Sequence, residues 1–504
     1  MSLLLVVTML FLFNSAAPAA TWYVQKTGSS DGNPCTQAAP CQTIGRGIDT
    51  MASGDTLEIG GGTYDECIED FGPHAVPGGQ SWSLPTTIKN KPGETVWLKR
   101  TTPCAGGLIE MDFRQYIIID GINVDAIQPD GFNPWTFGIG TAAAHIRFQN
   151  LEIMHARDNA MLNGSFNEMI NVNTHHAGVP FCPSEVGCHG IYWSGTDGLI
   201  HNVVSHDNNC MGIQMTSELG GVVNNTTQYS TFYNNGCTGI ISHPNNRVIG
   251  NVVYGNYLGI HVTSNVLVYN NTVYDNNFNG GSGVGIWPNG EGIQLSNNIS
   301  LGHTWDILNQ ETGNISYAAN ICAQVNAPFT IGCTSGSTAS ALFVNAGAAD
   351  FHLRSGSPAI DAGVTLALVT QDRDGVPRPQ PPGGAYDIGA YERTGTATGG
   401  TTLSASPTSV APGGTITATW SGIATPSATD WIGLYTLGAA NTAYIHWIYV
   451  SCSQNPGAAQ ASGSCPFVVS STVAPGTYQL RLLANDAFTL LATSNTFTVT
   501  SGSQ

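Results

Sequence analysis

The chain has 504 residues, and 15 Lys and Arg against 33 Asp and Glu give it a formal net charge of -18 at pH 7. A chain of this length can bury a large core and form more than one domain. Its acidity disfavours nucleic acid, which requires a basic surface, and it disfavours a bound polyanion unless a cation intervenes.

The first twenty residues resemble an export signal in composition. The apolar run LLLVVTMLFLF is followed by the small residues SAAPAA, so we expect a secretory signal that is cleaved near Ala20. A membrane anchor is the alternative, but the run is short for a membrane span. We therefore expect a secreted protein, extracellular or at the cell surface, with no transmembrane segment after cleavage.

Twelve cysteines in an exported chain predict disulfides. Neighbours in sequence suggest six pairs: Cys35 with Cys41, Cys67 with Cys104, Cys182 with Cys188, Cys210 with Cys237, Cys322 with Cys333, and Cys452 with Cys465. A Cys188 to Cys210 pair is the alternative, because both residues lie three positions before an equivalent Ile. No Cys-x-x-Cys pair indicates zinc.

Residues 21–100 contain short apolar runs separated by turn signals, which we interpret as an N-terminal cap and the first coils of a repeat. One such run is Thr56–Ile59, which precedes three glycines. Residues 116–121 predict a strand that enters a turn at Asp120. The repeat therefore begins before its most regular part.

Between His145 and Gln310 the chain repeats a phrase of roughly twenty to thirty residues. A first column of polar residues precedes short apolar runs: Asn150, Asn171, Asn202, Ser230, Asn251, Asn271 and Asn298. A second column begins short strands with a period of two: Met161, Ile191, Ile213, Ile240, Ile260, Ile286 and Ile307. Each repeat thus predicts a strand, a turn with an inward Asn, a strand, a variable loop and a strand.

Such coils stack about 4.8 Å apart, so an Asn in one coil can bond the Asn above and below it and satisfy buried polar groups. The repeat therefore predicts an all-β chain whose main part is a right-handed parallel β-helix. A β-sandwich or propeller with Asn-rich turns is the alternative.

After Asn320 the repeat fades, and residues 341–393 contain the motifs SPAIDAG, DRDGVPR and YDIGAYE. These motifs resemble the C-terminal segment of bacterial secreted parallel β-helix proteins of the pectate-lyase-like group. The resemblance implies the architecture and carries no reaction. Asp372 and Asp374 could hold calcium, but we favour an Asp-rich turn in which Arg378 pairs with Asp387 or Glu392.

The C-terminal part predicts a separate module. Residues 394–402 form a Gly/Thr linker. Residues 403–504 alternate in hydrophobicity between Pro-Gly turns, which predicts a β-sandwich, and the stretch DWIGLY is similar to one in immunoglobulin-like accessory modules. We expect Trp420, Trp431 and Trp447 to be core aromatics, with sugar stacking as the alternative. The predicted domains are a signal (1–20), a β-helix with caps (21–393), the linker, and the sandwich.

The loop before each strand of the second column varies most in length, and function tends to lie on such loops of a rigid stack. These loops and strands project polar and aromatic residues onto one face: His155, Arg157, Asp158, His175, His176, His189, Tyr192, His206, Asp207, Gln214, His243, His261 and Trp287. Each alone could simply satisfy backbone groups. Together we interpret them as one site.

The first chemistry that fits is β-elimination of a uronate polysaccharide, in which a base removes the proton beside the carboxylate and a donor stabilises the anion. We expect catalysis from His189, His155, His176, Tyr192, Arg157, Asp158 and Asp207. We expect sugar binding by Tyr192, Gln214, His243, His261 and Trp287. Calcium held by Asp158 and Asp207 is the candidate cofactor. No Lys follows Lys99, which excludes a lysine base in the repeats.

The second chemistry is hydrolysis by an inverting glycosidase with two carboxyl groups. Asp130-Gly131-Phe132, Asp158-Asn159-Ala160 and Cys188-His189-Gly190 resemble the Asn-Thr-Asp, Asp-Asp and Gly-His-Gly motifs of polygalacturonases. This resemblance implies Asp158 as the acid, Asp130 as a base and His189 as their support. Asn159 departs from the Asp pair, and Gln214 and Thr216 stand where the family has Arg and Lys, which puts activity on pectin in doubt.

A third reading is a non-catalytic carbohydrate-binding or adhesin-type surface protein. Among the three we favour the polysaccharide lyase, then the hydrolase, then the binder. We expect an extracellular polysaccharide as the partner, no nucleic acid, and a monomer.

Overall fold

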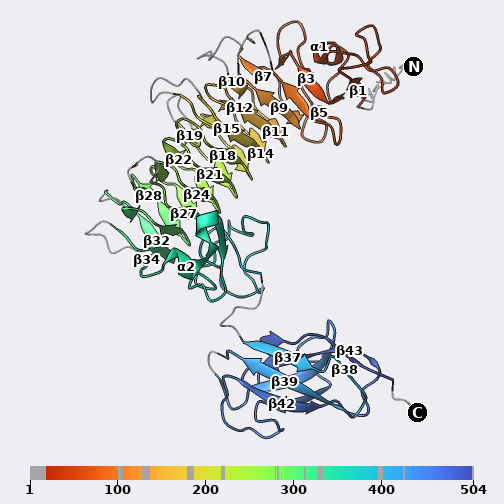
Figure 1. The fold of residues 1–504 in the computed structure, drawn as a ribbon, viewed down its shortest axis with the longest axis vertical. Coiled ribbons are helices and arrows are strands. Elements are labelled where there is room, and N and C mark those ends of the chain that lie inside the picture. Colours follow the sequence, from red (N-terminus) through yellow and green to blue (C-terminus); the bar gives the residue numbers. More distant parts are fainter. Residues whose placement is uncertain are drawn as a thin grey trace, which may run out of the picture.

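The computed structural model describes residues 19–99, 101, 104, 106–127, 137–178, 187–216, 222–277, 280, 283–310, 314–325, 333–394, 401–423 and 426–501. Two architectures follow one another along the chain (Figure 1). Three long parallel sheets come first, and sheets whose strands pair mainly antiparallel form the C-terminal part. The predicted all-β fold, a parallel β-helix followed by a β-sandwich, is confirmed.

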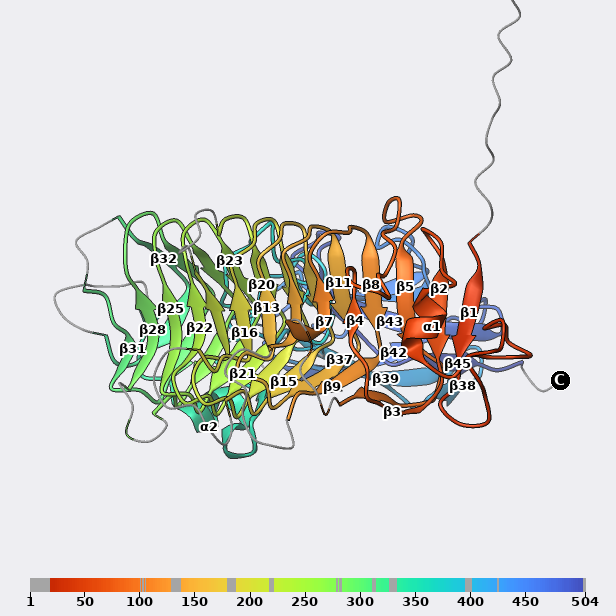
Figure 2. The same cartoon turned by 90° about the horizontal axis from the view of Figure 1, so that it is seen from above.

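Each coil passes through three sheets in turn, which stack along the axis of the helix (Figure 2). Sheet 1 contains β1 (Thr21–Val24), β2 (Thr56–Ile59), β5 (Thr86–Asn90), β8 (Ile117–Asp120), β11 (Ile146–Gln149), β14 (Glu168–Ile170), β17 (Leu199–His201), β20 (Thr226–Gln228), β23 (Arg247–Ile249), β26 (Leu267–Tyr269), β29 (Gln294–Ser296) and β32 (Ser316–Ala318). Sheet 2 contains β3 (Gly62–Tyr64), β6 (Val96–Leu98), β9 (Ile122–Asp125), β12 (Glu152–Met154), β15 (Asn173–His175), β18 (Val204–His206), β21 (Thr231–Tyr233), β24 (Val252–Tyr254), β27 (Thr272–Tyr274), β30 (Ile299–Leu301), β33 (Asn320–Cys322) and β34 (Cys333–Thr334). Sheet 3 contains β4 (Ile68–Glu69), β7 (Gly107–Met111), β10 (Phe137–Thr141), β13 (Ala160–Leu162), β16 (Ile191–Trp193), β19 (Ile213–Met215), β22 (Thr238–Ser242), β25 (Leu258–Val262), β28 (Val284–Pro288) and β31 (Trp305–Ile307).

The predicted second column forms the inward row of sheet 3. The isoleucines from Ile191 to Ile307 pair coil by coil, and their side chains are buried. Met161 is the exception, because Ala160 pairs with Ile191 and Met161 pairs with outward Tyr192. The prediction of Met161 was wrong since the inward residue of that coil is a small alanine, which carries little hydrophobic signal.

The predicted asparagine column combines two positions that differ by one residue. Asn150, Asn171 and Asn202 are exposed and have φ of 56°, 55° and 51°. In the next coil this left-handed position belongs to Tyr229, and Ser230 bonds the backbone of Val203. Asn tolerates positive φ and also forms ladders, so one residue type marks two different positions.

The inward ladder itself lies at the later position. The Nδ2 atoms of Asn251, Asn271 and Asn298 each donate to the Oδ1 of the next Asn at 3.0 Å, and the ladder ends on Asn320. The exposed asparagines form their own surface ladder, in which Asn202 donates to Asn171 at 2.7 Å. Ladder formation is therefore confirmed, and its register is corrected.

Two further buried ladders were not predicted. At the corner from sheet 2 to sheet 3, Asn208, Asn235, Asn256 and Asn276 follow one another with bonds of 2.8 Å. At the corner from sheet 3 to sheet 1, Asn225 donates to Asn246 at 3.2 Å. All three corners of the coil are thus held in register by amides.

The segment with the SPAIDAG and YDIGAYE motifs lies along the side of the coils. It contains α2 (Ala339–Leu342), β35 (Phe343–Asn345), the 3-10 helix η2 (Ala346–Ala348) and β36 (Asp350–Leu353). Its Phe343, Phe351 and Ile388 pack with Ile299 and Ile321 of sheet 2. Arg378 pairs with Glu392 at 2.7 Å, as expected of a structural turn.

The disulfides support the predicted pairs. Five bonds join Cys35 to Cys41, Cys67 to Cys104, Cys210 to Cys237, Cys322 to Cys333, and Cys452 to Cys465. Cys182 lies outside the described residues, while Cys188 is disulfide-bonded. Since Cys210 bonds Cys237, the alternative pair of Cys188 with Cys210 is excluded.

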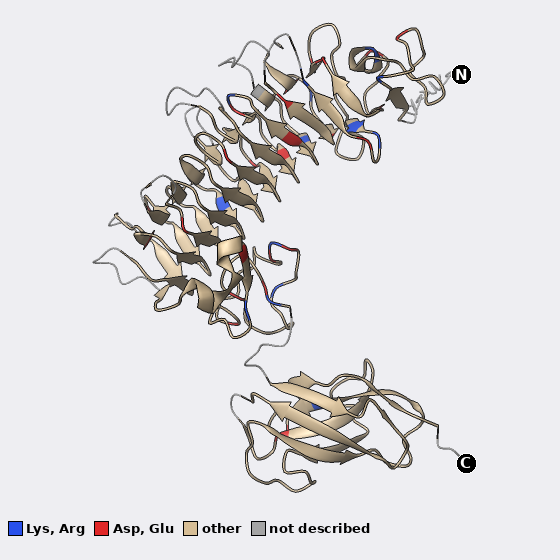
Figure 3. Ribbon diagram, viewed as in Figure 1, with Lys and Arg blue, Asp and Glu red and all other residues tan. Residues whose placement is uncertain are grey.

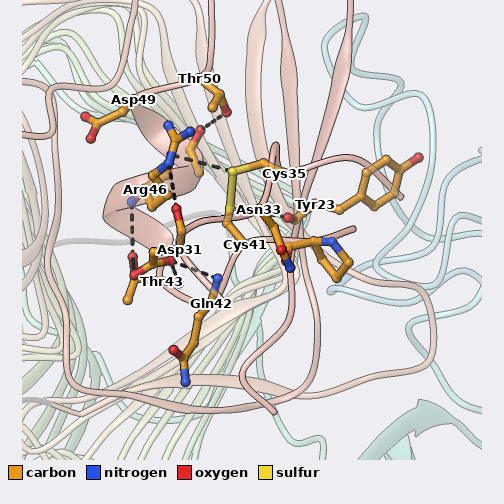
Figure 4. Close-up of a disulfide and its surroundings, with 12 residues drawn as sticks. Tyr23, Asp31, Asn33, Cys35, Cys41, Gln42, Thr43, Arg46, Asp49 and Thr50 are labelled. Atoms are coloured by element: carbon orange, nitrogen blue, oxygen red, sulfur yellow. Dashed lines mark hydrogen bonds between the residues drawn. A yellow bond between two sulfur atoms is a disulfide. The ribbon is translucent and has the colours of Figure 1, made fainter. Parts of the chain in front are cut away.

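The first disulfide fastens the N-terminal end of the stack (Figure 4). It lies beside α1 (Ile44–Ile48), whose N-cap Thr43 accepts from the backbone of Arg46. Asp31 accepts hydrogen bonds from the backbone of Gln42 and Thr43 at 2.9 Å. These contacts close the apolar end of the coil stack.

The C-terminal part is a sandwich of two sheets. One contains β37 (Thr402–Ser406), β39 (Thr415–Ser421) and β42 (Gly463–Val468), and the other contains β38 (Ser409–Val410), β45 (Phe497–Val499), β43 (Gly476–Leu483), β40 (Trp431–Thr436), β41 (His446–Tyr449) and β44 (Leu490–Thr493). Trp420 is buried between them, as predicted. None of the helices in the described part of the chain is long and apolar enough to cross a membrane.

Candidate active site

The residues predicted to form one site lie in two groups on two different sheets. Outward on sheet 2 and at its end are His155, His175, His176, His206 and Asp207. Beside sheet 3 are Arg157, Asp158, His189, Tyr192 and Gln214, which we call the sheet 3 site. His175 and His206 lie on strands of sheet 2, whereas Tyr192 and Gln214 lie on strands of sheet 3, so the predicted single cluster divides between two sheets.

The sheet 3 site is organised around a buried carboxylate. Asp158 is 4% exposed and accepts a 2.9 Å hydrogen bond from the backbone N–H of His189 in the next coil. Its other oxygen lies 3.6 Å from Nε of Arg157. Gly187 gives the guanidinium its space, because a Cβ there would meet Nε of Arg157 at 2.5 Å. The carboxylate thus positions both a cation and an imidazole.

His189 is held neutral by its surroundings. The residue is 3% exposed, and burial lowers the pKa of its imidazole below the usual value, an effect that the nearby Asp158 carboxylate and Gln214 side chain oppose. Its Nδ1 is buried, lies 4.0 Å from Asp158 Oδ1, and has no hydrogen-bond partner among the described residues. The ring stacks on Tyr192 with centroids 5.7 Å apart.

Tyr192 and Gln214 face outward on adjacent coils. Tyr192 pairs with Gln214 across β16 and β19, and both side chains are half-buried. Adjacent coils put such side chains about 5 Å apart. A ring, an amide, an imidazole and a guanidinium therefore converge at one edge of sheet 3.

The histidines of sheet 2 form a continuous stack instead. His175 stacks on His206 at 4.9 Å, and His206 stacks on Tyr233 at 4.6 Å. Carboxylates pair with these histidines and with their neighbour His155: His155 with Asp125, His175 with Glu152, and His206 with Asp207. Burial lowers the pKa of His176. We interpret this set as a surface ladder that fixes coil register, because its polar atoms bond one another.

His261 and Trp287 lie farther along sheet 3. They follow Gln214 by two and three coils in the outward row, since Ile241 lies between. Their rings stack at 4.5 Å, and burial lowers the pKa of His261 to about 4. His243 contributes a repulsive charge to His261. His261 and Trp287 lie in the same outward row as Tyr192, three and four coils farther along.

One functional candidate escaped the sequence prediction. Glu110 on β7 belongs to the same outward row, where it pairs with Glu69 and with Gly140. Burial, together with Asp112 and Glu69, raises its pKa to about 7 against a hydrogen bond from Gly107. The signal in the sequence was a lone carboxylate inside the apolar strand GLIEM. Asp130, predicted as a base, lies outside the described residues.

The predicted calcium ligands fit calcium poorly. Calcium takes six to eight oxygen ligands, whereas the oxygens of Asp158 face a backbone N–H and a guanidinium. Asp207 belongs to the sheet 2 group, where it bonds His206. Within the described part of the chain, three potential metal-ligating side chains meet only at Cys67, Glu69 and Cys104, where the cysteines are bonded to each other.

No protein-family model and no curated protein matches the chain. Among solved structures, it is similar to a rhamnogalacturonan lyase (16% identity, 65% of this chain and 91% of that chain, TM-score 0.48). It is also similar to XylC in complex with xylose (11%, 74% and 98%, 0.46) and to the Dettilon tailspike protein (14%, 63% and 67%, 0.38). At these identities and TM-scores the similarities assign no activity, so the chemistry rests on the residues of this chain.

Proposed function

We propose that this chain is a secreted polysaccharide lyase that cleaves a uronate-containing glycan by β-elimination at the sheet 3 site. The observation that carries the proposal is the neutral, buried His189, stacked on Tyr192 and held by Asp158 beside Arg157. An acidic polysaccharide outside the cell is the proposed substrate, and the disulfides suit that compartment.

In this mechanism Arg157 and Gln214 bind the uronate carboxylate and stabilise the negative charge that develops on it. Nε2 of His189, the nitrogen away from Asp158, removes the proton on the carbon next to the carboxylate. The electron pair forms the carbon–carbon double bond as the glycosidic C–O bond breaks. The leaving oxygen takes the hydroxyl proton of Tyr192. Solvent then returns a proton to Tyr192 and accepts the proton that His189 holds.

Asp158 acts on His189 and Arg157 and does not touch the sugar in this mechanism. Its two oxygens face the His189 backbone and the guanidinium, so we assign it a positioning role. His261 and Trp287, stacked farther along the same row, are proposed to bind a sugar unit away from the cleaved bond.

The proposal is tested by incubating the full chain with a panel of uronate polysaccharides. Elimination is followed by the ultraviolet absorbance of the new double bond, and any cleavage by new reducing ends. We expect both signals on at least one substrate, and Tyr192→Phe should lower the rate at least roughly 100-fold, the size of a general acid contribution. Tyr233→Phe on sheet 2 is the matched control and should keep the wild-type rate.

Glycoside hydrolysis is the second candidate because Glu110, with its pKa raised to about 7, can be a protonated general acid at neutral pH. Hydrolysis would give reducing ends without the absorbance, and Glu110→Gln would abolish them while Tyr192→Phe would not. If neither absorbance nor reducing ends appear while the chain still retains polysaccharide in a pull-down, the chain is a non-catalytic binder, and both the lyase and the hydrolase proposals are wrong.

A further inference from the structure

The sandwich contains a cavity walled by aromatic rings. Its volume is about 130 Å³, and it is lined by Trp431, Tyr444, Trp447, Tyr449, Asp486 and Phe488, which we call the aromatic cage. Trp431 on β40 is 5% exposed, whereas Tyr444 and Phe488 are 42% and 47% exposed. The cage therefore has a buried base and a rim open to solvent.

The rings form a box. Tyr444, Trp447 and Phe488 stand at 74°, 79° and 82° to the plane of Trp431, with centroids 5.3, 6.2 and 6.0 Å from it. Tyr449 stands at 79° to Trp447. A sugar stacks best on a flat ring face, whereas a compact group that presents methyl groups on all sides fits a box.

The polar atoms of the cage are largely committed to the protein itself. Trp431 Nε1 donates to the carbonyl of Ala487 at 3.1 Å, and the hydroxyl of Tyr449 donates to Asp486 Oδ1 at 2.7 Å. Few hydrogen-bonding groups therefore remain for sugar hydroxyls. What the cage offers a ligand is ring faces and one carboxylate.

The carboxylate of Asp486 is one of very few charged groups in the sandwich. Residues 401–504 contain only three Asp, Glu, Lys or Arg residues, which are Asp430, Arg481 and Asp486. Asp430 and Arg481 are buried, so Asp486 is the exposed one. Figure 3 shows how little charge this part of the chain carries. The single exposed negative charge lies at the aromatic cavity.

The DWIGLY stretch builds the cage. Buried Asp430 accepts hydrogen bonds from the backbone of Ser427 and Asn485 at 2.8 and 2.9 Å, which fixes the loop that carries Asp486. Gly433 leaves room for the rings, because a Cβ there would meet Trp431 at 2.9 Å. The motif thus holds the loop and supplies the base of the box.

We propose that the aromatic cage binds an organic cation with a compact methylated ammonium group. Ring faces carry negative electrostatic potential and attract cations, and quaternary ammonium groups are recognised by aromatic boxes of this kind. The Asp486 carboxylate adds charge attraction at the rim. This site is independent of the proposed lyase chemistry on the β-helix.

The test compares choline with 3,3-dimethyl-1-butanol, its neutral isostere, by calorimetric and ligand-observed NMR titration of the full chain. We expect choline to bind at least roughly ten-fold more tightly, since only its nitrogen carries charge. Asp486→Asn keeps a residue that tolerates the φ of 55° at this position. It should weaken choline roughly three- to ten-fold and leave the isostere unchanged.

Tyr444→Ala removes one exposed wall and should also weaken choline. Val468→Ala, 51% exposed on β42, is the control and should bind like the wild type, with all unfolding midpoints preserved. Equal binding of choline and its isostere, or no choline binding, would overturn the proposal. A neutral oligosaccharide whose binding is lost in Tyr444→Ala, without choline binding, would replace the cation by a sugar.

Discussion

Burial sets the protonation state of His189. The imidazole loses hydration inside the stack, so its neutral form is favoured and its pKa lies below the usual value. A neutral imidazole is the form that accepts a proton. His189 therefore stays neutral, and can accept a proton, at a lower pH than a solvent-exposed histidine can.

The pH dependence of the proposed elimination follows from this shift. As pH falls, the rate should decline only when His189 becomes protonated, which is below the ordinary histidine pKa of 6.5. Asp158→Asn removes the charge that raises this pKa, so the acid limb of kcat/KM should move to still lower pH. The measurement is a pH profile of both forms, and an unmoved limb would exclude His189 as the titrating base.

The sequence predicted the positions of some site residues and not of others. His189 stood between Cys188 and Gly190 at the start of a strand, so its position beside sheet 3 could be predicted. The sequence could not predict that His155, His176 and Asp207 lie apart from His189. A residue at the end of a sheet 2 strand and a residue at the start of the next sheet 3 strand are only a few positions apart in sequence. Glu110 was missed because its raised pKa depends first on its burial, and then on Asp112 and on Glu69, which only the fold brings beside it.

At the scale of the element, the inward asparagine ladder holds the coils in register. Asn271 accepts from the N–H and the side chain of Asn251 at 2.9 and 3.0 Å, and its own amide donates to two carbonyls and to Asn298. Every one of these atoms is buried. The loss of one amide leaves several partners without a hydrogen bond.

Two asparagine variants should separate the two ladders. Asn271→Ala should lower the free energy of unfolding by about 3 kcal/mol, because it strands buried polar groups. Asn202→Ala should cost about 1 kcal/mol, since that residue is exposed and the main loss is its tolerance of positive φ. Urea unfolding of both variants measures the difference, and equal losses would contradict the assigned register.

The period of the repeat predicted the sheets well because stacked coils must repeat their inward residues. Ile213, Ile240 and Ile260 are paired as the pattern required. The repeat did not predict the register of the asparagines as well, since a left-handed turn and a buried ladder both favour Asn. The positive φ of Tyr229 and the hydrogen bond from Val203 to Ser230 distinguish the two positions.

The whole molecule contains two large hydrophobic cores without a common residue. Phe232 belongs to the core of the β-helix, and Phe467 belongs to the core of the sandwich. Both side chains are fully buried. Each core can therefore lose its packing without exposing the other.

We expect two transitions when the full chain is unfolded in a calorimeter. Phe232→Ala and Phe467→Ala form a matched pair, each removing a phenyl ring at a cost of about 3 to 5 kcal/mol. Each should lower the midpoint of one transition and leave the other in place. A single transition that both variants shift would mean that the two parts unfold as one unit.

The C-terminal segment, residues 333–394, is anchored to several coils and so constrains how many coils lie between its anchors. Arg373 bonds Thr231, Ala390 bonds Thr272, and Gly389 bonds the backbone of Asn297. A coil inserted or deleted between Thr231 and Asn297 would displace one anchor by about 4.8 Å relative to the others. Among the described residues, the hydrogen bonds of this segment reach no coil before that of Thr231, so a coil added there, next to the proposed site, would leave these three anchors in place.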